Sequence, residues 1–231
     1  MSELSHRDSD STTPYVAATG VYIGSLVSLA VLAVMLLGEL RTDPFLQGIM
    51  AVVVLPAWVV ASARASKQPL SHFGFTFKWS TAATKGLGLL LPVVLYNVWH
   101  ATWRGLAMLA SAEHPTISSA LGVAFETGLV APVAEEMLFR GYMLTTLLDG
   151  ARAPRRFLGL TTLSWYVSVL FLIPHLNFGT PDFVLTSLGR LYASLVFCWV
   201  FEQTRSLSGP IAAHFLLNLA TALVALVPLI H

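Results

Sequence analysis

Three ionisable side chains inside a long apolar stretch are the first residues in this chain that could do chemistry. Glu135 and Glu136 are adjacent, and Arg140 follows one helical turn later, in the segment 134–141 (AEEMLFRG). A charged side chain at membrane depth is costly unless it is paired, solvated or used in function. On a helix, Glu136 and Arg140 share a face and can form an ion pair, whereas Glu135 points roughly 100° away. One glutamate could therefore transfer protons; the alternative is a buried pair that only fixes helix packing.

Two histidines and an asparagine interrupt two further apolar segments. His175 ends the run 171–175 (FLIPH), and His214 and Asn218 stand four residues apart after Ser-Gly-Pro at 208–210, a good helix start. Taken alone, His175 is typical of an interface residue near a helix end. His214 and Asn218, taken alone, are as typical of hydrogen bonds that join membrane helices as of catalysis.

Taken together, these side chains could activate a water molecule and stabilise an oxyanion. A carboxylate with a histidine can take a proton from water as a general base. A second histidine with an asparagine amide can donate hydrogen bonds to the developing oxyanion. Glu135, His175 and His214 are also a plausible zinc set, although the sequence contains no His-Glu-x-x-His motif. The residues leave metal-free and metal-dependent chemistry open.

Three motifs occur in one order along the chain: Glu-Glu-x-x-x-Arg at 135–140, Phe-x-x-x-His at 171–175 and His-x-x-x-Asn at 214–218. They resemble the CPBP family of intramembrane proteases, which includes the Ras-converting CAAX endopeptidase, bacterial Abi proteins and myxosortases. The resemblance covers about residues 118–225, which we expect to form the catalytic core.

The resemblance implies a catalytic role for six residues. Glu135 would activate water with help from His175. Glu136 and Arg140 would brace the site. His214 and Asn218 would stabilise the oxyanion. Ser194 and Cys198 stand where small residues are common in the family, and neither is expected to touch the chemistry.

Arg190 is a further polar residue, about eight residues into the apolar segment 183–201. Its side chain could snorkel to the nearer membrane interface. The alternative is substrate binding, in which Arg190 faces the cavity and contacts a substrate carboxylate or a lipid phosphate.

The composition predicts the elements that must position these residues. The 231 residues are 55% hydrophobic and 11% charged, with a mean hydropathy of +0.72, whereas soluble domains carry about 25% charged residues. Apolar blocks of roughly 17–25 residues are long enough to cross a bilayer. We therefore expect an all-α, polytopic helical membrane protein with about seven to eight transmembrane helices, the count rising to eight if the long fourth segment is broken. The seven expected spans are 15–40, 45–63, 86–108, 117–148, 157–176, 183–201 and 211–230.

The chain is expected to have a disordered cytoplasmic tail at 1–14 and a membrane-embedded domain at 15–231. Two basic connections, 64–85 and 149–156, should face the cytoplasm. We predict a multi-pass protein of the bacterial inner membrane. The net charge of +1 is uninformative about nucleic acid, but the sequence has no basic cluster of the kind that binds it, so we expect no nucleic-acid partner.

The expected spans conflict with the expected chemistry. They put His175 near the outer end of its helix and His214 one turn from the inner end of its own. The two histidines should then lie far apart, although the mechanism requires both near one water.

The function expected from motifs and composition is that of an intramembrane endopeptidase of the CAAX-protease type. Its substrate would be a membrane-associated or lipid-linked protein, cut near a C-terminal tail. No cofactor is certain, and zinc is an alternative. The competing functions are a non-catalytic, immunity-type or scaffold membrane protein and, less favoured because the sequence shows no inverted repeat, a proton-coupled transporter.

Overall fold

The computed structural model describes residues 19–20, 56–57, 59–109, 128, 130–151, 153–176, 178 and 181–225. The expected tail and most of the first two expected spans lie outside the described residues. The number of transmembrane helices expected from the sequence therefore remains a prediction. The part that is described is mostly helical and contains all of the residues proposed for the chemistry.

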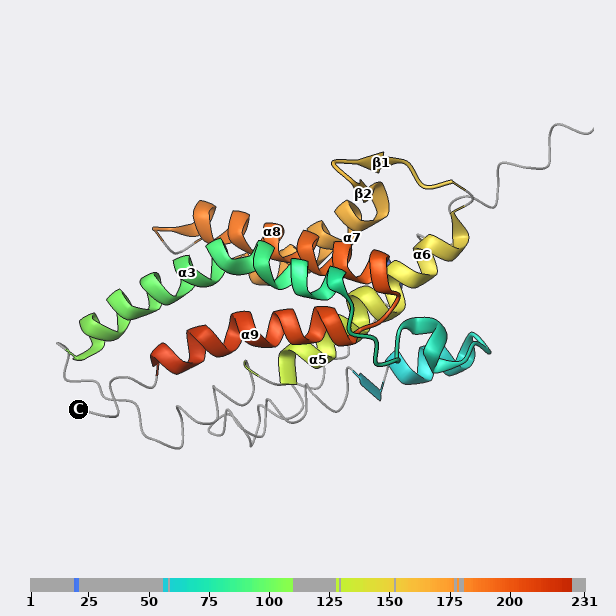
Figure 1. Ribbon diagram of the computed structural model, residues 1–231, viewed down its shortest axis with the longest axis horizontal. Coiled ribbons are helices and arrows are strands. Elements are labelled where there is room, and N and C mark those ends of the chain that lie inside the picture. The colour runs from blue at the N-terminus through green and yellow to red at the C-terminus, as the bar shows by residue number, and fades with distance from the viewer. Residues whose placement is uncertain are drawn as a thin grey trace, which may run out of the picture.

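Long apolar helices form the frame of the described part (Figure 1). Helix α3 packs against α8 and α9, and α8 also packs against α9. Among the described residues, two segments are long and apolar enough to cross a membrane, Thr81–Trp99 and Phe183–Thr204. The helices are α3 (Thr81–Leu109), α8 (Phe183–Thr204) and α9 (Ser208–Ala225).

A left-handed residue makes the tight turn between α8 and α9. Arg205 caps α8 with φ 49° and ψ 36°, and its backbone N–H donates to the carbonyl of Phe201. This conformation normally favours glycine at a helix C-terminus. Helix α9 then begins at Ser208, three residues before the expected start of the seventh span, with Pro210 in its first turn.

Glycines allow α3 and α9 to approach α8 closely at Val200. A Cβ atom on Gly86 of α3 would overlap the Val200 side chain, and one on Gly209 would lie 2.7 Å from a Val200 methyl carbon. A Cβ atom on Gly88, two residues further along α3, would have no neighbouring atom within 4 Å. The close packing of the three helices is therefore specific to the face that carries Gly86.

The described part of the fourth apolar segment is helical but changes type in the middle. It consists of α5 (Ala131–Glu136), the π-helix η3 (Met137–Leu144) and α6 (Thr145–Gly150). Extended π-helices are rare and often occur at functional sites. All eight residues of η3 are buried, so this widened helix forms the centre of the packed interior.

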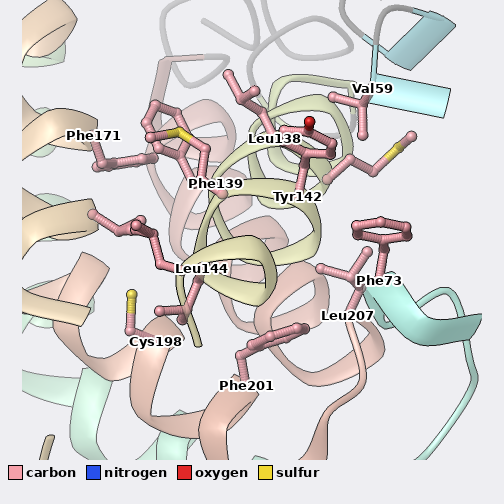
Figure 2. Packing of buried hydrophobic residues seen from close by; sticks show 14 of the residues in the cluster. Val59, Phe73, Leu138, Phe139, Tyr142, Leu144, Phe171, Cys198, Phe201 and Leu207 are labelled. Carbon is pink, nitrogen blue, oxygen red and sulfur yellow. The ribbon is translucent and has the colours of Figure 1, made fainter. Parts of the chain in front are cut away.

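The main apolar cluster surrounds η3 on several sides (Figure 2). Leu138, Phe139 and Tyr142 project from η3 itself. Phe171 reaches the cluster from α7 and Phe201 from α8. Because η3 is enclosed in this way, its side chains are fixed relative to both helices.

A short hairpin precedes α7, so the all-α expectation needs a small correction. Strands β1 (Arg156–Phe157) and β2 (Leu160–Thr161) pair antiparallel. The two residues between them, Leu158 and Gly159, have φ of 51° and 80°, as a type I′ turn requires. Leucine is an unusual residue at positive φ, so the residue types at 158–159 do not predict this turn.

Helix α7 is shorter than the span expected at 157–176. It runs from Thr162 to Leu172 and continues as the 3-10 turn η4 (Ile173–His175). The Thr161 side chain caps the start of α7 by accepting from the Ser164 N–H. Together α7 and η4 rise roughly 22 Å, against roughly 30 Å for the 20-residue helix that was expected.

Glu202 of α8 fixes the start of α7. One of its oxygens accepts hydrogen bonds from Thr161 N, Thr161 Oγ1 and Ser164 Oγ at 3.0, 2.7 and 2.6 Å. Its other oxygen lies 3.3 Å from Nη2 of Arg156 in the hairpin. These contacts determine the level at which α7 begins, and hence the level that His175 reaches at its other end.

The two basic connections lie at the same end of the helices, as one membrane orientation requires. Nε2 of His72, in the 3-10 turn η1 (Leu70–Phe73), lies 2.6 Å from Oδ2 of Asp149 at the end of α6. In Figure 1, α6 and the hairpin lie at the right-hand end.

Candidate active site

A buried ion pair forms the base of the site. Glu136 and Arg140 are both 0% exposed, and Nη1 of Arg140 donates to Oε1 of Glu136 at 2.9 Å. Nη2 of Arg140 donates to the backbone oxygen and to Oγ of Ser194 on α8, at 2.9 and 2.6 Å. Because a buried charge is tolerated only when paired and hydrogen-bonded, these contacts explain how Arg140 can sit in an apolar interior.

Aromatic rings complete the surroundings of the Arg140 guanidinium. The distances from its Cζ atom to three ring centroids are 4.9, 5.2 and 6.0 Å, for Phe171, Phe197 and Phe139 respectively. Each cation–π contact of a desolvated guanidinium contributes about 0.5–2 kcal/mol. The rings therefore stabilise the charge and also exclude water from it.

His214 is oriented by the same carboxylate. Its Nδ1 atom lies 3.0 Å from Oε1 of Glu136, and the ring of Phe197 stacks on the imidazole with a centroid distance of 4.9 Å. A carboxylate held by arginine is ionised and can only accept, so Nδ1 of His214 carries a proton. Nε2 then points toward Glu135, 3.9 Å from Oε2.

His175 is held in a matching way by the Phe171 of its motif. Nδ1 of His175 donates to the Phe171 carbonyl at 2.7 Å, since a carbonyl can only accept. The Phe171 ring also stacks on the imidazole at 4.7 Å. Nε2 of His175 is left facing Glu135, 3.8 Å from Oε1. No role was expected for Phe171 beyond its place in the motif, although its four-residue spacing from His175 predicts that the two side chains lie on one helix face.

Glu135 therefore lies between the Nε2 atoms of two histidines. Its side chain is 22% exposed, and its Oε2 atom, although buried, finds no hydrogen-bond partner among the residues the structure describes. Separations of 3.8 and 3.9 Å are too long for direct hydrogen bonds and suit a bridging water. The expected distance between His175 and His214 is wrong, because α7 begins late, at Thr162, and ends at the level of Glu135.

Two further predicted residues, Asn218 and Arg190, lie on the helices that carry or contact the site histidines. Asn218 follows His214 by one turn on α9 and is partly buried on the same face. Arg190 of α8 is exposed, and its Nη1 atom donates to the backbone oxygen of His175 at 2.6 Å. Arg190 therefore contacts the segment that carries a site histidine.

Ser194 is a further residue of the site, and no role was expected for it from its position in the sequence. Both of its oxygen atoms accept from Arg140, so Ser194 contacts a residue that is expected to brace the site, although Ser194 itself was not expected to touch the chemistry. Ser194 carries a hydroxyl inside an otherwise apolar segment, one helical turn from Arg190. This polar side chain was the feature of the sequence that indicated a possible role.

The donor chemistry for zinc is present, but the arrangement is not that of a metal site. Nδ1–H groups held by a carbonyl and a carboxylate, with Nε2 free, are typical of histidine ligands. Two ligands about 2.0–2.1 Å from a tetrahedral zinc ion would lie roughly 3.3 Å apart, closer than either histidine lies to Glu135. In the described ranges, no three His, Cys, Asp or Glu side chains are arranged to hold a metal ion. The mechanism proposed below therefore uses no metal ion.

Residues 116–220 match the model of the Rce1-like family, described as type II CAAX prenyl endopeptidase Rce1-like, a family of integral membrane proteases. The resemblance inferred from the three motifs is thus confirmed. A search of curated proteins and a search of solved structures each found no match.

Proposed function

We propose that this protein is an intramembrane endopeptidase of the CAAX-protease type that uses a water molecule activated by Glu135. The proposal is carried by one observation: Nε2 of His175 and Nε2 of His214 lie 3.8 and 3.9 Å from the two oxygens of Glu135. The Rce1-like family match supports the same class of reaction. The substrate would be a membrane-associated or lipid-linked protein, cut near its C-terminal tail.

In this mechanism Glu135 is the general base. It takes a proton from water while the free Nε2 lone pair of His175 accepts the second hydrogen bond of that water. The water oxygen attacks the scissile carbonyl carbon, and the carbonyl oxygen becomes an oxyanion. The protonated Glu135 then gives its proton to the leaving amine as the C–N bond breaks.

His214 and Asn218 would stabilise the oxyanion. Because Nδ1 of His214 already donates to Glu136, Nε2 can donate only when the ring is a positively charged imidazolium. Glu136 would then be the counter-charge next to the imidazolium, in the place that a buried aspartate takes beside the histidine of a serine protease. The Asn218 amide supplies a neutral donor from the same face of α9.

The differing exposure of the site residues indicates the side from which the peptide approaches. Glu136 and Arg140 are fully buried, whereas the side chains of Glu135 and His175 are 22% and 28% exposed. We propose that the peptide lies against Glu135 and His175. The apolar lengths of α3 and α8 support a multi-pass membrane location; the bacterial inner membrane is the prediction we retain.

A scaffold role is the competing function, and the Glu136–Arg140–Ser194 contacts by themselves would suit it. The position of Glu135 argues against it, because its partly exposed carboxylate faces Nε2 of both histidines at 3.8 and 3.9 Å, an arrangement that the buried ion pair does not need. The test compares Glu135→Ala and His214→Ala for processing of a prenylated reporter protein at equal membrane abundance. Lost processing at normal abundance supports catalysis, and normal processing in both variants removes it.

A further inference from the structure

We propose that Arg190 binds the free C-terminal carboxylate of the peptide substrate beside His175. This inference rests on the proposed function and deepens it, since it assigns recognition of the C-terminal end of the substrate to one side chain, Arg190. It adds a specificity-determining residue to a site that otherwise recognises only a peptide bond.

The first observation is the place at which the guanidinium is anchored. Nη1 of Arg190 donates to the His175 carbonyl at 2.6 Å, which fixes the guanidinium next to a residue that faces Glu135. An arginine carries five N–H donors in a rigid plane. This is its one hydrogen bond in the part of the chain that the structure describes, so the other donors remain for a ligand.

The second observation is the surroundings of Arg190. It lies roughly 10 Å along α8 at 1.5 Å per residue, inside a helix that is apolar enough to cross a membrane. Its exposed neighbours on that helix are Val184, Leu185 and Leu188. A cation in such surroundings is costly unless it is paired or functional. An apolar peptide that ends in a single carboxylate complements both the cation and its neighbours.

The geometry suits a carboxylate that follows the scissile bond by a few residues. A guanidinium binds carboxylates through two parallel hydrogen bonds, which adds direction as well as energy. An extended peptide advances about 3.3 Å per residue, so two or three residues beyond the scissile bond span about 7–10 Å. A peptide that lies against His175 passes beside this guanidinium, because Arg190 is bonded to the His175 carbonyl.

The test uses the purified full-length protein and two peptides that differ only in a free carboxylate or a carboxamide at the C-terminus. For the wild-type protein, we expect KM for the free acid to be lower by about tenfold or more, as for a charge-assisted pair. In Arg190→Gln the two peptides should become equivalent, and Arg190→Lys should retain part of the preference. Arg155→Gln, which removes an exposed arginine far along the chain, is the matched control.

The comparison of both peptides in each variant removes any effect of Arg190 on His175, because the carboxamide serves as the reference within the same protein. An unchanged preference in Arg190→Gln, or no preference in the wild-type protein, would overturn the inference and leave the proposed function standing. Failure of the wild-type protein to cut either peptide would instead count against the proposed function.

A lipid phosphate is the other anion that could bind Arg190. Repeating the assay in nanodiscs with and without anionic lipid separates the two. If Arg190→Gln changed the response to anionic lipid and affected both peptides equally, Arg190 would be a lipid contact and the inference would be wrong.

Discussion

Oε1 of Glu136 lies 3.0 Å from Nδ1 of His214 and also accepts a hydrogen bond from Arg140 at 2.9 Å. One oxygen atom thus joins the buried ion pair to the orientation of a histidine on α9. Any change that releases Arg140 will therefore also disturb the imidazole that faces Glu135.

The adjacent glutamates should differ sharply in their contribution to stability. Glu136→Ala leaves Arg140 buried without its counter-charge, which costs about 3–5 kcal/mol. Glu135→Ala removes a partly exposed side chain that has no hydrogen bond in the described structure, and should leave the thermal midpoint almost unchanged. Thermal unfolding of the two purified variants checks this order, and equal midpoints would contradict the assignment of the ion pair.

Ser194 should affect both stability and turnover. Ser194→Ala leaves one N–H of the buried Arg140 without an acceptor, at a cost of about 1–3 kcal/mol. Because Arg140 holds Glu136, and Glu136 orients His214, we expect kcat to fall while KM stays constant. The matched control is Ser168→Ala, since Ser168 is equally buried but has only a 3.5 Å contact with the Cys198 sulfur. Equal kinetics for the two variants would rule out this positioning role.

Alanine substitutions at Gly86 and Gly88 of α3 should have opposite effects on stability, because only Gly86 packs closely against another helix. Gly86→Ala should destabilise the protein by about 1–3 kcal/mol, because the new methyl group overlaps Val200. Gly88→Ala meets nothing within 4 Å and should be neutral or stabilising by up to about 1 kcal/mol. The midpoints of thermal unfolding distinguish them. The packing of α3 on α8 would be in doubt if Gly86→Ala were as stable as Gly88→Ala.

Metal removal tests the route of water activation. The separations between Glu135 and the two histidines lead us to expect that the purified protein keeps its peptidase activity after treatment with a strong chelator. Activity before and after treatment is measured together with the metal content of the protein. Loss of activity that added zinc restores would instead assign Glu135, His175 and His214 as zinc ligands.

Local spacing was enough to predict part of the site. The Glu136–Arg140 pair follows from a four-residue separation, and helix α8 follows from an apolar run with turn residues at both ends. These features depend on residues close together in sequence, for which the helical period is a direct guide. The sequence could not assign the partners of Arg140 across helices, so Ser194 was missed.

The conflict over the histidines arose from one wrong boundary. The apolar run at 157–176 reads as a membrane helix, but its first residues form a hairpin and Thr161 caps the helix. Leu158 at positive φ carries no turn signal, and Glu202, which holds the hairpin, lies about 40 residues away in the chain. Long-range contacts of this kind fix where a helix begins, and a single sequence does not reveal them.

The most direct test of the mechanism is the catalytic rate of Glu135→Gln. This substitution keeps the size of the side chain and removes the base, while leaving the Glu136–Arg140 pair intact. We predict a fall in kcat of about 10²–10⁴-fold on a prenylated peptide, as expected for loss of a general base, with an unchanged thermal midpoint. A folded Glu135→Gln protein that turns over as fast as the wild type would contradict the role of Glu135.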